Sequence, residues 1–219
     1  MLLEILGLLM SKELIKRLIT SIFILTVTVY SIYLGALIFN LFLLLIFIIS
    51  LIEWKNLTNN RIIFSLGLLF LFLSLISVYV LRYENFHFFI FILIISVSSD
   101  VGGYVFGKLL GGPKLTKISP NKTYAGMCGS YLFSFILGIS YLYFFDKLLF
   151  SEKLSFSFFI ILLISTVNQI GDLIISFFKR KQKIKNTGKL LPGHGGLLDR
   201  IDGIIFSYLI GYLINQLFL

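Results

Sequence analysis

The longest apolar run, residues 18–52, constrains the fold more than any other feature, because its 35 residues include no charged side chain. A helix needs about 20 apolar residues to cross the hydrocarbon core of a bilayer, within a range of roughly 17–25. The run is therefore too long for one span and just long enough for two. We place the break between these two spans at Gly35-Ala36.

Five further apolar runs follow, at residues 62–81, 86–99, 124–145, 154–178 and 201–219. Only 13% of the chain is charged, whereas a soluble domain carries about a quarter charged residues. We therefore expect an all-α polytopic membrane protein with about seven transmembrane helices. This composition argues against a soluble repeat protein, a disordered chain and a nucleic-acid-binding domain.

The basic residues are unevenly divided among the segments between the apolar runs. If the N-terminus is cytoplasmic, sixteen lysines and arginines lie in cytoplasmic segments and three in external ones. Cytoplasmic loops carry an excess of these residues, so we expect a cytoplasmic N-terminus. Membrane orientation and phosphorylated ligands then account for the net charge of +9. Trp54 is expected at a membrane interface, and the single cysteine, Cys128, excludes an internal disulfide and a cysteine-based metal cluster.

Two long segments, residues 100–126 and 171–202, hold almost all the unusual residues, and both fall on the expected cytoplasmic side. Cytoplasmic nucleotides can therefore reach both. We expect a single integral membrane domain over residues 1–219. Within it, residues 1–99 form an N-terminal helical part and residues 100–219 a motif-bearing catalytic part.

Asp172 is the most unusual of the carboxylates, because it lies inside the apolar run that ends at Phe178, about 9 Å along a helix at 1.5 Å per residue. A charge at such a depth costs roughly 2.5–3.5 kcal/mol on insertion scales, so it needs a partner or a purpose. Ser176, Lys179 and Arg180 follow it on the same helical face. A structural Asp–Arg pair is one interpretation. A metal or phosphate site is favoured, because more carboxylates converge here.

Asp199 and Asp202 are expected to share one face of the first turn of the last span, and Asp100 to end the fourth span at the same membrane face. Charge complementarity with a helix N-terminus would explain one of them. It does not explain the preceding glycine-rich segment PGHGG, whose backbone can approach a ligand closely. Mg²⁺ prefers oxygen ligands and bridges carboxylates to substrate phosphates. The pattern therefore predicts a nucleotidyl-transfer or phosphoryl-transfer site.

Basic residues surround these carboxylates, as expected where phosphates must be positioned and neutralised. The candidates in the second segment are Lys179, Arg180, Lys185, Lys189 and Arg200. For Lys181 and Lys183 we prefer contact with anionic lipid.

The remaining candidates lie in loops. Ser119 and Pro120 resemble the cap and the first position of a helix. Helix N-termini bind phosphates. Lys122 is therefore either a phosphate ligand or part of a simple helix start. His194, between glycines, could donate to a phosphate, carry a proton or hydrogen-bond to the loop backbone.

The segment SFFKRKQKIKNTGKLLPGHGGLLDRID, residues 176–202, resembles the signature of phosphatidate cytidylyltransferases, also called CDP-diacylglycerol synthases. The pattern is Ser, Lys-Arg, Lys-Asp and a Pro-x-His-Gly-Gly-x-x-Asp-Arg-x-Asp ending. The resemblance covers the chain from Asp100 onward by motif, including Gly171-Asp172-Leu173 and SPNKTYAG, and the rest by helix pattern. Asn186 departs from the family's Asp, and Ile175 from its common Glu; each departure removes a carboxylate.

The resemblance implies that CTP and phosphatidate react to give CDP-diacylglycerol and pyrophosphate, in phospholipid biosynthesis. It further implies a bacterial inner-membrane protein whose active site faces the cytoplasm. The implied metal ligands, for Mg²⁺ with or without a second cation, are Asp172, Asp199 and Asp202. The implied catalytic residues are Asp172, Lys179, Arg180, His194, Asp199 and Arg200. The implied substrate-binding residues are Ser119, Asn121, Lys122, Thr123, Ser176, Lys185, Lys189, Gly195 and Gly196.

Three alternatives stay open. A CTP-dependent polyprenol or phytol kinase would transfer the terminal phosphate to an alcohol and would need a base, for which His194 could serve. A transporter would bury its polar residues near mid-membrane, whereas these cluster at one face. A catalytically inactive lipid-binding paralogue would explain Asn186 and Ile175. The sequence does not fix the oligomeric state, with a homodimer among the alternatives.

Overall fold

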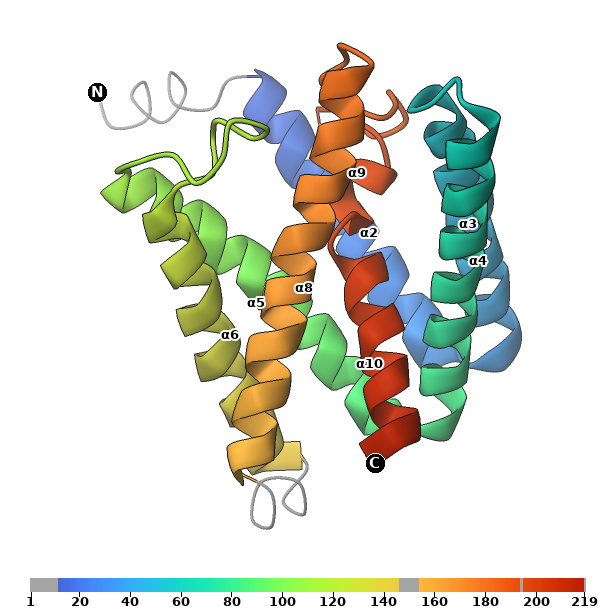
Figure 1. Ribbon diagram of the computed structural model, residues 1–219. Coiled ribbons are helices and arrows are strands. Elements are labelled where there is room, and N and C mark those ends of the chain that lie inside the picture. The colour runs from blue at the N-terminus through green and yellow to red at the C-terminus, as the bar shows by residue number, and fades with distance from the viewer. Residues whose placement is uncertain (1–11, 146–153, 194, 219) are drawn as a thin grey trace.

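The computed structural model of the protein describes residues 12–145, 154–193 and 195–218, and in these residues every regular element is a helix (Figure 1). The helices are α2 (Lys12–Leu34), α3 (Ala36–Asn56), α4 (Arg61–Glu84), α5 (Phe86–Leu110), α6 (Tyr124–Phe145), α8 (Leu154–Lys181), α9 (Leu198–Ile201) and α10 (Ile204–Phe218).

Five of these helices, α3, α4, α5, α6 and α8, are long and apolar enough to cross a membrane. Two shorter apolar stretches accompany them, Ile19–Leu34 within α2 and Ile204–Phe218 in α10. The prediction of an all-helical, multi-pass membrane protein is therefore confirmed. In a bilayer only helices and closed barrels satisfy every backbone hydrogen bond internally, and these apolar sequences form the helices.

The predicted break in the run 18–52 lies at Gly35, which separates α2 from α3. Its φ of +85° lies in the left-handed region, which glycine adopts readily because it has no Cβ. Apart from Gly35 and its own chain neighbours, no described atom lies within 4 Å of the position that a Cβ would take. The backbone conformation, and not a lack of space, therefore favours glycine here.

Helix α5 is longer than predicted, because it continues past Ser99 to Leu110 and so places Asp100 inside the helix. The apolar run ends at Asp100, but the helix goes on where its glycines pack against α6. A Cβ on Gly102 would lie 2.8 Å from Cβ of Phe133, and a Cβ on Gly129 would lie 2.6 Å from the carbonyl oxygen of Gly102. Small residues of this kind let transmembrane helices approach closely.

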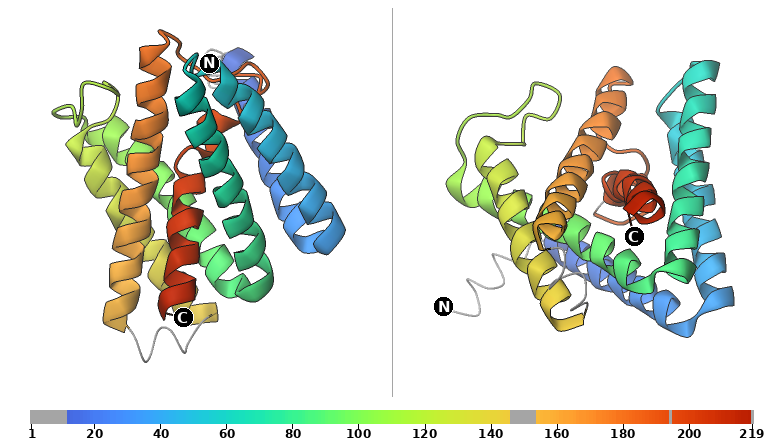
Figure 2. Two further views of the ribbon diagram at one scale, coloured as in Figure 1. Left: turned by 45° about the vertical axis from the view of Figure 1, so that its right-hand side comes forward. Right: turned by 60° about the horizontal axis from the view of Figure 1, so that its bottom comes forward.

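Helix α10 packs against α4, α5 and α8, and Figure 2 shows it enclosed by these helices. Near its start lies an apolar cluster formed by the buried residues Trp54, Leu57, Leu71, Ile175, Leu198 and Ile205. The ring of Trp54, which is expected at a membrane interface, is buried in this cluster. Its Nε1 donates to the carbonyl of Phe64 at 3.3 Å and its ring meets Phe178 edge-on, at 5.0 Å between centroids.

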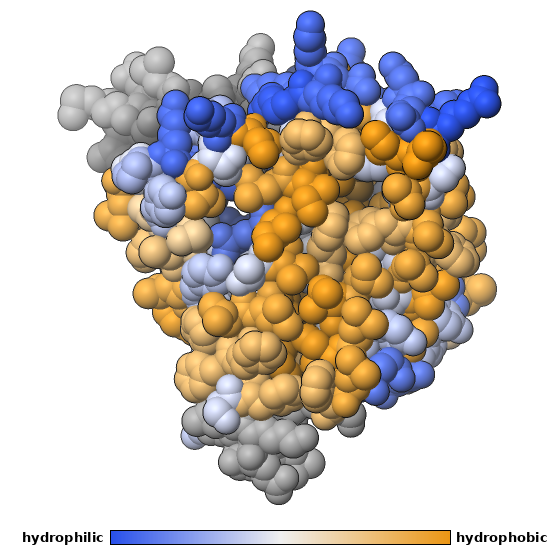
Figure 3. Space-filling model, viewed as in Figure 1, coloured by the Kyte–Doolittle hydropathy of each residue, from blue (hydrophilic) through white to orange (hydrophobic). Residues whose placement is uncertain are grey.

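The two segments that join α5 to α6 and α8 to α9 lie at the same end of the bundle (Figure 1). We call them the first loop, residues 111–123, and the second loop, residues 182–197. Hydrophilic residues gather at this end, whereas the flanks below it are mainly hydrophobic (Figure 3). The fold thus brings the two segments that the sequence singled out to one face, which we call the loop end.

Candidate functional site

Asp172 of α8 and Lys122 of the first loop are in direct contact, with 2.7 Å between Asp172 Oδ2 and Lys122 Nζ. One turn after Asp172, the hydroxyl of Ser176 donates to Asp172 Oδ1 at 3.2 Å. Lys122 Nζ also donates to the carbonyl of Gln169, at 3.2 Å. Residues from both predicted segments therefore meet at this carboxylate, whose described ion-pair partner is a lysine and not an arginine.

The first loop holds Lys122 in a turn, and the predicted helix start at Ser119 and Pro120 is wrong. The amide of Lys122 donates to the carbonyl of Ser119 at 3.0 Å and so closes the turn, and α6 begins only at Tyr124. Thr123 is the residue that caps α6, since its hydroxyl accepts from the amide of Gly126 at 3.1 Å. Asn121 lies exposed in the turn.

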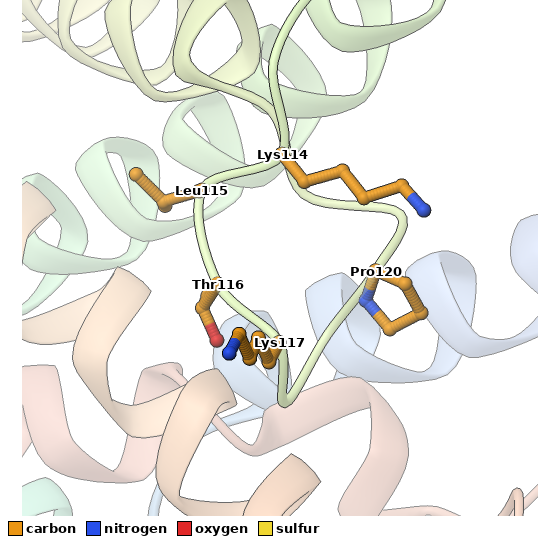
Figure 4. A pocket seen from close by; sticks show the side chains of 5 residues that line it. All are labelled: Lys114, Leu115, Thr116, Lys117 and Pro120. Atoms are coloured by element: carbon orange, nitrogen blue, oxygen red, sulfur yellow. The ribbon is translucent and has the colours of Figure 1, made fainter.

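A pocket of about 560 Å³ opens within the first loop, lined by Lys114, Leu115, Thr116, Lys117 and Pro120 (Figure 4). Lys114 and Pro120 extend to one side of the loop and Leu115 to the other. No carboxylate lines this pocket. Two of the acidic residues instead lie on neighbouring helices, Asp100 on α5 and Asp172 on α8.

Asp199 of α9 is held by three donors. Its Oδ1 lies 2.8 Å from Lys179 Nζ, and its Oδ2 accepts from the amides of Thr187 and Gly196 at 2.9 and 3.0 Å. Its side chain is only 5% exposed. Because both oxygens already accept hydrogen bonds within the protein, this arrangement suits a carboxylate that positions the second loop.

Asp202 lies in the turn between α9 and α10, and not in the first turn of the last long helix as predicted. The helix is interrupted at Gly203, where a Cβ would lie 2.6 Å from the carbonyl oxygen of Asn168 on α8. The carboxyl group of Asp202 is buried and neighbours that of Asp172. Burial and the nearby Asp172 carboxylate raise the pKa of Asp202 well above its usual range.

Asp100 of α5 is exposed and accepts a hydrogen bond from the side-chain amide of Asn168, at 2.7 Å. Asn168 is fully buried, and its Oδ1 has no hydrogen-bond partner among the described residues. The sequence analysis did not select Asn168. A detectable signal existed, because Asn168, Asp172 and Ser176 are spaced at four-residue intervals on one face of an apolar helix.

Most of the other predicted residues lie at the loop end, near the carboxylates or on its surface. Arg180, Lys185, Lys189 and Arg200 are exposed, and Ser176 and Lys179 are buried. His194 lies outside the described residues. Among the described residues, no three His, Cys, Asp or Glu side chains are grouped so that they could hold a metal ion as they stand.

The two departures from the family pattern lie in different surroundings. Ile175 is 3% exposed in the apolar cluster beside Trp54 and Leu198, so a carboxylate would be buried among apolar side chains there. Asn186 is exposed next to Gly195, whose φ is +93°; a Cβ on this glycine would lie 2.8 Å from Asn186 Cγ and 2.9 Å from Asp199 Oδ2.

Glu53, at the end of α3, is a residue that the sequence analysis missed. It is buried, its Oε1 accepts from the amide of Leu197 at 2.9 Å, and its Oε2 accepts from the amide of Leu198 at 2.8 Å and the hydroxyl of Thr187 at 2.7 Å. Its only signal in the sequence was its place directly after the charge-free run 18–52. The carboxylate ties the N-terminal part of the chain to the second loop.

Comparison with known proteins shows which family this chain is similar to in sequence. The model of the cytidylyltransferase family matches residues 62–218. A phosphatidate cytidylyltransferase of Staphylococcus aureus (strain COL) is 40% identical over 129 residues, which are 58% of this chain and 48% of the relative. One of Staphylococcus saprophyticus is 34% identical over 163 residues, 71% of this chain and 62% of the relative. One of Rickettsia bellii (strain RML369-C) is 34% identical over 189 residues, 83% of this chain and 81% of the relative. The chain thus matches about half the length of the S. aureus relative.

Proposed function

The chain belongs to the cytidylyltransferase family, and from this premise we propose that it transfers the cytidylyl group of CTP to phosphatidate, giving CDP-diacylglycerol and pyrophosphate. The names of its relatives suggest the substrates. The observation that carries the proposal is the contact between Lys122 and Asp172, because it joins the two polar segments of the sequence into one site at the loop end. A nucleotide and the head group of a lipid can both reach such a site.

In the proposed reaction a phosphate oxygen of phosphatidate attacks the α-phosphorus of CTP, and the bond to pyrophosphate breaks. The lipid phosphate is already anionic, so no protein nucleophile and no base are required. The protein has to align two negatively charged substrates and neutralise their repulsion. Lys122, Arg180, Lys189 and Arg200 are the cationic residues that we assign to this role, with Lys185 beside them.

We assign Mg²⁺ to Asp172 and Asp202. These carboxyl groups are neighbours, and an additional positive charge would relieve their mutual repulsion. Carboxylate oxygens are also the donors that Mg²⁺ prefers. Both Asp172 and Asp199 accept hydrogen bonds within the protein, but the side chain of Asp199 is only 5% exposed, against 31% for Asp172, so Asp199 fits this role less well. When bound, the cation would supply charge stabilisation at the phosphate oxygens.

We further propose that the loop end faces the cytoplasm of a bacterial cell, and that α2 and α10 complete seven membrane spans. Sixteen of the nineteen basic residues fall on that side under this arrangement, in agreement with the positive-inside tendency. The site would then face the compartment that holds CTP.

One assay tests the proposed function. Purified protein in detergent–lipid micelles is given labelled CTP, Mg²⁺ and phosphatidate, and the products are separated. CDP-diacylglycerol and pyrophosphate are expected, with loss of turnover on chelation of Mg²⁺ and recovery on its return. CDP together with a phosphorylated alcohol, when a polyprenol or phytol is supplied, would instead identify a kinase. Absence of any turnover with retained phosphatidate binding would identify an inactive paralogue.

A further inference from the structure

Glu53 lies outside the part of the chain that the family model matches, yet its carboxylate contacts the second loop. Thr187 and Leu198, which donate to Glu53 Oε2, are 134 and 145 residues away along the chain. Glu53 is only 4% exposed. A buried carboxylate is costly unless hydrogen bonds compensate for the loss of water, and here three donors do so.

The donors to Glu53 include two backbone amides at the beginning of α9. The first amides of a helix have no partner within it, and Leu197, at the N-cap position, provides no side-chain cap. Glu53 accepts from the amides of Leu197 and Leu198 at 2.9 and 2.8 Å and so replaces that cap from a different helix.

Glu53 and Asp199 together hold the same stretch of backbone. The amide of Thr187 donates to Asp199 and its hydroxyl donates to Glu53. The amide of Gly196 donates to Asp199, and those of the next two residues donate to Glu53. The two carboxylates therefore accept from three consecutive amides and from the amide and the hydroxyl of Thr187.

Two glycines of the second loop make room for this arrangement. A Cβ on Gly188 would lie 2.6 Å from Glu53 Oε1, and a Cβ on Gly196 would overlap with the Thr187 hydroxyl and the Glu53 carboxylate. Gly196 was predicted to bind substrate. Its lack of a side chain is explained here by Glu53 and Thr187, so Gly188 and Gly196 reflect the contact of the loop with α3.

We propose that Glu53 is a positioning residue for the transfer reaction, which holds the second loop and thereby the place of α9 and of Asp202 directly after it. The inference rests on the proposed function. Glu53 does not contact the substrates; it acts through the loop backbone. Any displacement of the loop would move the charges that align the two phosphates, and small misplacements of such groups lower the rate strongly.

The test uses Glu53→Gln, since the amide keeps the size of the side chain but one of its two ends can no longer accept hydrogen bonds. At a temperature where the variant is fully folded and at saturating substrates, kcat is expected to fall about 10- to 100-fold, with less than a threefold change in KM for phosphatidate. Ser50→Ala is the matched control, one turn earlier on α3, because Ser50 is buried and its hydroxyl has no partner among the described residues. It should retain kcat.

Thr187 supplies a second comparison. Thr187→Ser keeps the hydroxyl that donates to Glu53 and should retain most of kcat, whereas Thr187→Val should lower it. The double variant Thr187→Val with Glu53→Gln should lower kcat by less than the product of the two single fold-changes. Both substitutions affect the same hydrogen bond, from the Thr187 hydroxyl to Glu53. If Glu53→Gln lowers only the melting temperature and the folded variant keeps wild-type kcat, the positioning role is wrong.

Limited proteolysis separates this inference from the proposed function. Lys185 and Lys189 are exposed in the second loop, so trypsin should cleave there faster in Glu53→Gln than in Ser50→Ala. If the wild type transfers no cytidylyl group, the proposed function fails, and the cleavage rates still test whether Glu53 holds the loop. Equal cleavage rates in the two variants would overturn the placement of the loop by Glu53.

Discussion

The ammonium group of Lys179 and the carboxylate of Asp199 form a nearly buried ion pair, 2.8 Å between Nζ and Oδ1, which joins the last turn of α8 to α9. The second loop begins and ends at these two helices, so the pair fixes the separation of its ends. Both residues were predicted as catalytic from the sequence. From their contact with each other we propose instead that they position the second loop.

Replacement of Lys179 by Met should destabilise the protein strongly. The side chains of Lys179 and Asp199 are 11% and 5% exposed, so the substitution leaves a buried carboxylate without its cation, at a cost of about 3–5 kcal/mol. The free energy of unfolding in detergent micelles would measure this loss. Lys181→Met, at an exposed position on the same helix, should change it by less than about 0.5 kcal/mol.

The double variant Lys179→Met with Asp199→Asn tests the pairing itself. Once Asp199 is neutral, Lys179→Met no longer leaves an unpaired charge, so the combined loss of stability should be smaller than the sum of the single losses. Strict additivity would contradict the pairing.

Asp172→Asn should abolish most turnover while the protein stays folded. The substitution removes the negative charge that pairs with Lys122 and that we assign to Mg²⁺, so we expect kcat to fall by at least about 100-fold. Product formation from labelled CTP measures the effect, and the melting temperature checks the fold. Glu84→Gln is the matched carboxylate-to-amide control, since Glu84 is exposed and contacts Gln216 away from the second loop. Near-normal turnover of Asp172→Asn would remove Asp172 from the site.

Lys122→Met should weaken the productive binding of CTP. Among the described residues of the first loop, only Lys122 forms an ion pair with Asp172. Removal of its charge should raise KM for CTP about tenfold. Charged hydrogen bonds of this type contribute roughly 1.5–3 kcal/mol. Lys117→Met, at an exposed position of the same loop, serves as the control. An equal increase of KM in both variants would indicate a general charge effect and no specific role for Lys122.

Gly129→Ala should loosen the contact between α5 and α6. The new methyl group would lie 2.6 Å from the carbonyl oxygen of Gly102 and from Phe106 Cγ, so the helices must separate, at a cost of about 1–3 kcal/mol. Thermal unfolding followed by circular dichroism would measure it. Cys128→Ala changes the preceding, exposed residue and should be nearly neutral. A neutral Gly129→Ala would show that close approach at this position is not required.

The site was only partly predictable, and Glu53 and Asp199 show the limit. Asp199 stood out because it follows a glycine-rich segment, but its pairing with Lys179 depends on how the second loop folds back on α8. Glu53 carried almost no local signal, because its partners are more than 130 residues away. Ser119 and Pro120 gave a misleading signal, since a turn and a helix start share the same residue types.

The sequence by itself determined the helices, the break at Gly35 and the two polar segments. Long apolar runs in a membrane have to form helices, because no water is present to satisfy the backbone, and this requirement is local. Only the tertiary structure decided that α5 continues to Leu110, that Lys122 reaches Asp172, and that Glu53 and Lys179 hold the second loop. These contacts join residues far apart in the chain, and they depend on how closely the packed helices approach one another, which residue order alone does not specify.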